Sequence, residues 1–209
     1  MGRSDPLIRP FYHEHIKPQG EIALLGFVNN SWFDGDLYDL QLNNWNINDN
    51  WELDKKYDTI ISLRCPYFAK NPEDFIERCY SHLNDKGKLY VDWGLGDHWR
   101  YANYKIGWVK DGEHEEAYEE GNCLWSGVWD DSFLENEEYK LFQSRVKKYG
   151  YHDVKKAAHE QIPKILEIKK IKKYFDISYN MKALWSGFME RPLTLLAPQL
   201  YILVSGTKR

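Results

Sequence analysis

Residues 57–93, YDTIISLRCPYFAKNPEDFIERCYSHLNDKGKLYVDW, decide the fold, because they predict a strand, a helix and a second strand in succession. Residues 59–63 are an apolar, β-branched run, which is typical of a strand covered on both faces in a parallel sheet. Asn71 can cap a helix and Pro72 suits its first position, so we expect the helix to begin there. The turn-forming residues 84–87, Asn-Asp-Lys-Gly, end it before the chain becomes apolar again.

The second strand of this unit, residues 88–93, should lie parallel to the first, because a helical connection of this length makes a right-handed crossover. In such sheets, ligands bind at the carboxyl ends of the strands. We therefore expect functional residues in segments 62–67 and 92–99, where the two strands end.

The C-terminal residues predict two further strands of different kinds. Apolar and polar side chains alternate strictly from residue 175 to 183, as in a strand with one exposed face at a sheet edge. Residues 200–204 are apolar throughout and should be covered on both faces. Together the two patterns predict that residues 174–183 form the edge of the sheet and residues 200–205 an antiparallel strand inside it.

Size and composition favour one α/β domain that spans residues 1–209. With 209 residues, of which 43% are apolar, the chain can bury one substantial core. We expect residues 1–20, which contain three prolines, to form an irregular arm. Residues 94–130 are rich in aromatic and acidic side chains and are expected to form an insertion or lid.

Charge and cysteine content narrow the functional classes. The net charge of −4 does not favour a broad surface for nucleic acid or for anionic membranes. The three cysteines are widely spaced, which fits a reducing compartment better than a disulfide framework. No apolar run approaches the roughly 20 residues of a membrane span. We expect a soluble, cytoplasmic protein without a metal; composition alone names neither a partner nor an oligomeric state.

Loops at the predicted strand ends offer candidates for chemistry. Asp97 and His98 lie side by side in a glycine-containing loop, so either is a candidate general base; the alternative is an ordinary surface loop. Gly26 lies near the end of an earlier apolar strand, residues 21–27, where a glycine lets the backbone approach a ligand closely.

These motifs resemble those of the class I S-adenosylmethionine (SAM) dependent methyltransferases. Residues 57–62 are similar to the family's FDxVxS strand, residues 71–75 to its helix start, and residues 83–91 to its turn and following strand. In the family, a parallel sheet ends in an antiparallel hairpin whose last strand is inserted inside the edge. The resemblance implies a Rossmann-like α/β fold with a mostly parallel sheet, helices on both faces and a C-terminal antiparallel hairpin.

The resemblance also implies an enzyme that transfers the methyl group of SAM to a small-molecule acceptor, with His98 or Asp97 taking the acceptor's proton. Asp49 matches the acidic position that faces adenine in the family, and Asp36 and Asp39 are both candidates for the residue that binds the ribose. The implied cofactor site comprises Gly26, Phe27, Asn29, Asp49, Asn50, Ser62 and Leu63. The implied acceptor site comprises Arg64, Tyr67, Trp93 and Trp99.

The first half of the chain departs from the family pattern. Val28 and Asn30 stand where further glycines are expected, and Asp49 follows Gly26 by only 23 positions, so at least one crossover must be missing or reduced. A methyltransferase-like domain that has lost SAM and serves as a binding or scaffold module therefore stays open, as does another nucleotide-handling α/β enzyme. A second partial likeness, to amino-methyltransferases that carry Pro-Pro-Tyr, covers only Pro66 and Tyr67 and does not favour methylation of nucleic acid.

Overall fold

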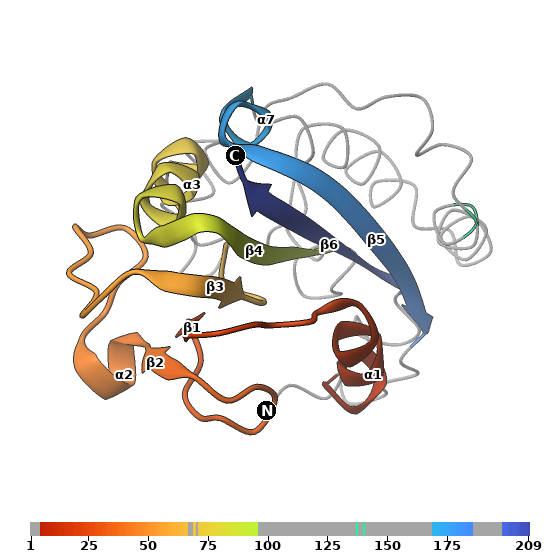
Figure 1. Ribbon diagram of the computed structural model, residues 1–209. Coiled ribbons are helices and arrows are strands. Elements are labelled where there is room, and N and C mark those ends of the chain that lie inside the picture. The colour runs from red at the N-terminus through yellow and green to blue at the C-terminus, as the bar shows by residue number, and fades with distance from the viewer. Residues whose placement is uncertain are drawn as a thin grey trace.

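The computed structural model describes residues 5–66, 69, 71–95, 137, 140, 169–185 and 198–209. In this part of the chain, six strands form one sheet in the order β2-β1-β3-β4-β6-β5 (Figure 1). The elements are α1 (Asp5–His15), β1 (Ile22–Leu25), β2 (Asp36–Tyr38), α2 (Leu40–Asn43), β3 (Tyr57–Ser62), α3 (Pro72–Ser81), β4 (Leu83–Leu95), α7 (Lys169–Tyr174), β5 (Phe175–Trp185) and β6 (Pro198–Lys208).

The central β3-α3-β4 unit confirms the prediction made from residues 57–93, since β3 and β4 are parallel neighbours. Asn71 is the N-cap of α3, and its side chain accepts hydrogen bonds from the next two available backbone N–H groups, those of residues 73 and 74. The residues of the predicted turn, 84–87, fall within β4, where they interrupt its pairing with β3. Leu83 pairs with Tyr57, but Lys88 already pairs with Thr59, so the intervening residues leave the ladder.

The C-terminal hairpin is also confirmed. β5 lies at the edge of the sheet, and β6 runs antiparallel to both β4 and β5 between them. Residues 201–204 of β6 are each no more than 2% exposed. Ile202 and Val204 join the core on one face of the sheet, and Tyr201 and Leu203 join the core on the other. A strand buried on both faces cannot lie at an edge that presents one face to water, which explains why the last strand is inserted.

The first half of the fold is reduced, as the short spacing predicts. Between β1 and β3 the chain forms only β2 and the single-turn α2. β2 is parallel to β1 and is the other edge of the sheet. The connection from β1 to β2, residues 26–35, contains no helix. This connection is therefore a loop where the family pattern has a crossover helix.

The prediction of an irregular arm for residues 1–20 is wrong, because residues 5–15 form helix α1. Proline suits the first turn of a helix, where the backbone N–H has no partner, so Pro6 does not oppose it. Pro10 lies inside the helix and removes one hydrogen bond. That cost is offset by burial, since Ile8, Phe11 and Tyr12 are at most 6% exposed.

The sheet has helices on both faces (Figure 1). α1 contributes to a core cluster that includes Leu24, Ile61 and Leu63 on one face. α3 and α7 cover the other face, where the cluster includes Phe75 and Ile171. Of the helices that the structure describes, none has the length and apolar character needed to cross a membrane.

Candidate functional site

A cavity of about 190 Å3 lies where the loops after β1 and β3 meet, at the carboxyl ends of these two strands. Its walls are aromatic and polar, and one of them carries a positive charge. The lining residues are Gly26, Phe27, Val28, Asn29, Ser31, Trp32, Leu63 and Arg64. The cavity therefore lies where the parallel-sheet rule places ligands, between two segments that are far apart in the sequence.

Gly26 has a backbone conformation that favours glycine, with φ +79°. Its N–H donates to the carbonyl of Tyr38 at 2.7 Å, which joins the ends of β1 and β2. A Cβ atom at this position would lie 2.6 Å from the Sγ atom of Cys65. The glycine is thus required by the packing of the loop after β3 as well as by its own dihedral angle.

The loop that forms one cavity wall, residues 27–33, is fastened to α1. Arg9 donates a hydrogen bond to the carbonyl of Ser31. The rings of Tyr12 and Trp32 lie 5.7 Å apart, and those of His13 and Phe33 lie 5.1 Å apart. α1 therefore holds the wall in place although no crossover helix follows β1.

A buried carboxylate lies next to the cavity. Asp92 of β4 is fully buried, and the hydroxyl of Tyr12 donates to its Oδ2 atom. The backbone N–H of Arg64 donates to its Oδ1 atom. Burial and the neighbouring carboxylate raise the pKa of Tyr12, so this hydroxyl stays protonated as a donor. Asp92 is the first residue of segment 92–99, in which functional residues were expected, although no role was assigned to it. Tyr12 was not predicted as a site residue, because it lies in the segment expected to be an irregular arm.

The structure brings five of the predicted site residues together around the cavity. These are Gly26, Phe27, Asn29, Leu63 and Arg64. Ser62 is fully buried behind them, and its hydroxyl donates to the carbonyl of Leu25 at 3.1 Å.

Other predicted site residues lie elsewhere. Asp49 and Asn50 are exposed and do not line the cavity. The carbonyl of Asp49 accepts from Arg78 in the last turn of α3, a helix that ends beside the first residue of β3. The backbone of Trp93 pairs with Ile202 of β6.

Several predicted residues fall in the part of the chain that the structure does not describe. They are the acceptor-site residues Tyr67 and Trp99, the candidate bases Asp97 and His98, and most of the predicted lid at 94–130. Their roles stay predictions.

The two candidates for the ribose acid lie at opposite ends of β2. Asp36 is the first residue of the strand, and Asp39 follows its last residue at the carboxyl edge. The Oδ1 atom of Asp39 accepts from the N–H of Gln41 at 2.8 Å as the N-cap of α2. Only Asp39 therefore lies on the edge where the cavity opens.

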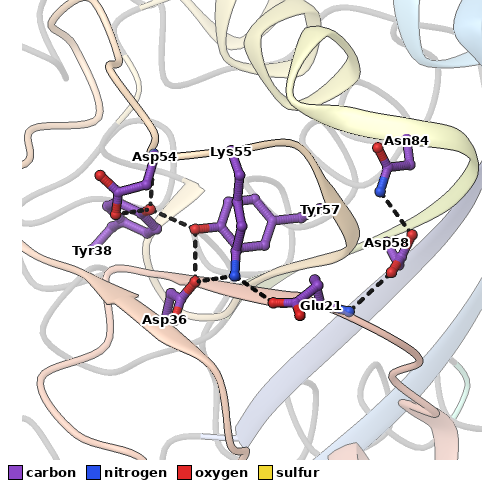
Figure 2. Close-up of polar contacts among 8 residues, drawn as sticks. All are labelled: Glu21, Asp36, Tyr38, Asp54, Lys55, Tyr57, Asp58 and Asn84. Carbon is purple, nitrogen blue, oxygen red and sulfur yellow. Dashed lines mark hydrogen bonds and ion pairs between the residues drawn. The ribbon is translucent and has the colours of Figure 1, made fainter.

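Asp36 belongs instead to a polar network at the amino end of β3 (Figure 2). Its carboxylate accepts from the hydroxyl of Tyr57 at 2.9 Å and pairs with Lys55 at 3.3 Å. The hydroxyl of Tyr57 is 2.6 Å from that of Tyr38, which also donates to Asp54 at 3.1 Å. Burial is the main cause that raises the pKa of Tyr57. These bonds tie the segment before β3 to edge strand β2, which points to a structural role.

No protein-family model matches the chain, and no curated protein sequence matches it. Solved structures do match. An inferred SAM-dependent methyltransferase from Listeria monocytogenes has a TM-score of 0.50 and 11% identity over 100% of both chains. A SAM-dependent methyltransferase from Thermotoga maritima has a TM-score of 0.47 and 12% identity over 97% of this chain and 89% of its own. N-methyltransferase NodS from Bradyrhizobium japonicum has a TM-score of 0.42 and 9% identity, covering 99% and 94%.

At such identities a structural match informs on the fold alone. The Listeria structure covers the whole chain, and the observed strand order, with an inserted antiparallel last strand, agrees with the family architecture that the motifs imply. The chain therefore has the Rossmann-like fold of the class I SAM-dependent methyltransferases.

Proposed function

We propose that the protein is a SAM-dependent methyltransferase that acts on a small-molecule acceptor. The observation that carries the proposal is the cavity between the loop after β1 and the end of β3. Five residues selected for cofactor or acceptor binding from sequence motifs line this one cavity. Its position at the carboxyl edge is the position at which α/β sheets of this type bind ligands.

The residues present fit part of SAM. A cavity of about 190 Å3 is smaller than the roughly 300–1,000 Å3 typical of pockets that enclose a whole ligand. It would hold one end of the cofactor, while the other end would follow the carboxyl edge toward β2. Asp39 lies there, and a carboxylate is an acceptor-only group that suits two ribose hydroxyls. The assignment of Asp49 and Asn50 to the adenine stays a prediction.

When bound, SAM would supply a methyl group on a positively charged sulfur; the acceptor would take this group by direct displacement, with S-adenosylhomocysteine as the leaving group. The contribution of the chain is to orient the reactants and exclude water, which accounts for most of the acceleration in such a reaction. Phe27 and Trp32 supply apolar walls for that purpose. Asp97 or His98 would remove the acceptor's proton, a role that remains predicted.

A domain that has lost SAM and acts as a scaffold is the alternative. One observation favours it: Gly26 is already explained by its contact with Cys65, so the glycine alone does not require a ligand. The two proposals differ in whether the cavity binds the cofactor.

Isothermal titration calorimetry with SAM and S-adenosylhomocysteine distinguishes the two. We expect weak binding by the wild-type protein and a loss of about tenfold or more in Asp39→Asn, since a hydrogen bond to a charged group contributes about 1.5–3 kcal/mol. Asp85→Asn, at an exposed position of β4, is the matched control and should bind as the wild type. Asp49→Ala tests the adenine assignment, because an unchanged Kd would remove Asp49 from the site. No heat at millimolar concentrations of either ligand would favour the scaffold.

A further inference from the structure

The residues that line the cavity include a positively charged side chain and no negatively charged one. Arg64 is half-buried and is the charged member of the eight lining residues, none of which is acidic. A second guanidinium, that of Arg9, donates to the carbonyl of Ser31, which also lines the cavity. The nearby carboxylates of Asp39 and Asp92 lie outside the lining. Such a wall attracts an anionic group rather than a cation.

Arg64 also has a backbone conformation that an L-residue rarely adopts, with φ 58°. Strain of this kind persists only where the surrounding structure imposes it, and it is concentrated at ligand sites. Here the imposing group is Asp92, whose Oδ1 atom accepts from the N–H of Arg64. Asp92 is fixed in turn by the hydroxyl of Tyr12. The buried carboxylate thus determines where the Arg64 side chain leaves the end of β3.

The chemistry that matches these walls is a carboxylate on an apolar or aromatic body. A guanidinium presents a planar fork of N–H donors that fits the two oxygens of a carboxylate. Phe27 and Trp32 offer aromatic surface beside it, and Asn29 and Ser31 offer further polar groups. A dianionic phosphate would call for more cationic donors than the lining provides.

We propose that the cavity binds a carboxylate through Arg64 and that Asp92 is the positioning residue that holds Arg64 for this contact. The carboxylate has two candidate sources. One is the amino-acid end of SAM, and for this source the inference rests on the proposed function and deepens it. The other is a carboxylate on the methyl acceptor.

The first experiment tests the cofactor as the source. Calorimetry compares S-adenosylhomocysteine with 5′-methylthioadenosine, which lacks the amino-acid group, in wild type and Arg64→Gln. If the cofactor supplies the carboxylate, Arg64→Gln weakens S-adenosylhomocysteine roughly tenfold to a hundredfold and leaves 5′-methylthioadenosine within about twofold. Arg64→Lys, which keeps the charge but not the fork, should recover part of the loss. Arg209→Gln, which breaks a surface pair with Asp176, is the matched arginine control.

The second experiment tests the acceptor as the source. Backbone amide shifts are followed while benzoate or its neutral analogue benzamide is added, with and without saturating S-adenosylhomocysteine. If the acceptor supplies the carboxylate, benzoate binds at least tenfold more tightly than benzamide to the wild type in the presence of S-adenosylhomocysteine, and Arg64→Gln removes the preference. Inorganic phosphate that displaces benzoate equally well would overturn the carboxylate assignment.

The two proposals fail in different ways. If neither adenosine ligand binds but benzoate is still preferred through Arg64, the methyltransferase assignment fails and the carboxylate site stands. If the adenosine ligands bind but Arg64→Gln changes no preference in either experiment, the carboxylate site fails alone. For Asp92→Asn we expect a selective loss for the carboxylate ligand of each pair. An equal loss for both ligands, or none, would overturn the positioning role of Asp92.

Discussion

Replacing Gly26 with alanine tests the close approach on which the cavity depends. The new Cβ atom would lie 2.6 Å from Sγ and 2.7 Å from Cβ of Cys65, at a residue whose φ is +79°. The left-handed conformation costs an L-residue about 1–2 kcal/mol, and an added methyl group in a filled site costs about 1–3 kcal/mol. We therefore expect Gly26→Ala to lower the free energy of unfolding by about 2–5 kcal/mol, a large fraction of a typical domain stability of about 5–15 kcal/mol.

Urea unfolding of a double-mutant cycle separates the two contributions. Cys65→Ala removes Sγ but keeps Cβ, so Gly26→Ala should cost about 1 kcal/mol less in that background than in the wild type. Asn44→Ala is the control for the backbone contribution, because Asn44 is exposed with φ 57°. This control should cost less than about 2 kcal/mol.

The reasoning would be refuted if Gly26→Ala cost less than about 0.5 kcal/mol and showed no coupling to Cys65→Ala. The loop after β3 would then have room beside Gly26, and close packing against Cys65 would no longer explain the glycine. A ligand that approaches the backbone would become the better explanation. A large cost with coupling would instead show that this glycine is no evidence for cofactor binding.

Three further outcomes are expected. Tyr12→Phe deprives the buried carboxylate of Asp92 of a donor, so urea unfolding should show a loss of about 1–3 kcal/mol; a change below about 0.5 kcal/mol would contradict that bond. Desolvation raises the pKa of the half-buried Cys65 thiol to about 12, so mass spectrometry should show little iodoacetamide adduct at pH 8 in the folded protein, whereas prompt labelling would contradict the raised pKa. The side chain of Asn84 donates to Asp58 and is the main cause that holds the pKa of this carboxyl below its usual range; the N–H of residue 21 contributes less. Asn84→Ala should therefore raise this pKa in a carboxyl NMR titration. A carboxyl whose pKa is lowered in the folded state stabilises the fold above its unfolded pKa and loses that effect as the pH falls through the folded pKa. The stability of the variant should therefore depend less on pH in this acidic range. An unchanged titration of Asp58 would contradict the contact.

Local signals predicted the second half of the fold well. The N-cap at Asn71, the apolar run of β3 and the alternation in β5 each depend on neighbouring residues, and the structure has each element at the predicted place. The insertion of β6 could also be predicted, because apolar side chains on both faces require cover on both faces. The observed boundaries differ where tertiary pairing extends a strand, as in β4, which begins at Leu83 rather than Lys88.

The candidate site was predicted only in part, because much of it depends on contacts between distant segments. Gly26 and Arg64 could be selected from their positions at strand ends. The hydrogen bond from Tyr12 to Asp92 joins residues 80 positions apart, and no local sequence pattern predicts it. The prolines of α1 pointed to an irregular arm, since their local cost is visible in sequence whereas the burial that offsets it is not.

The reduced first half and helix α1 are two parts of one arrangement. Where a crossover helix would have followed β1, the loop at 27–33 has to be held by something else. α1 supplies that support through Arg9 and the ring of Tyr12. The hydroxyl of the same tyrosine reaches Asp92, which holds the backbone of Arg64 on the opposite wall. Both walls of the cavity are therefore attached to one helix at the start of the chain, which supports the site without a crossover helix after β1.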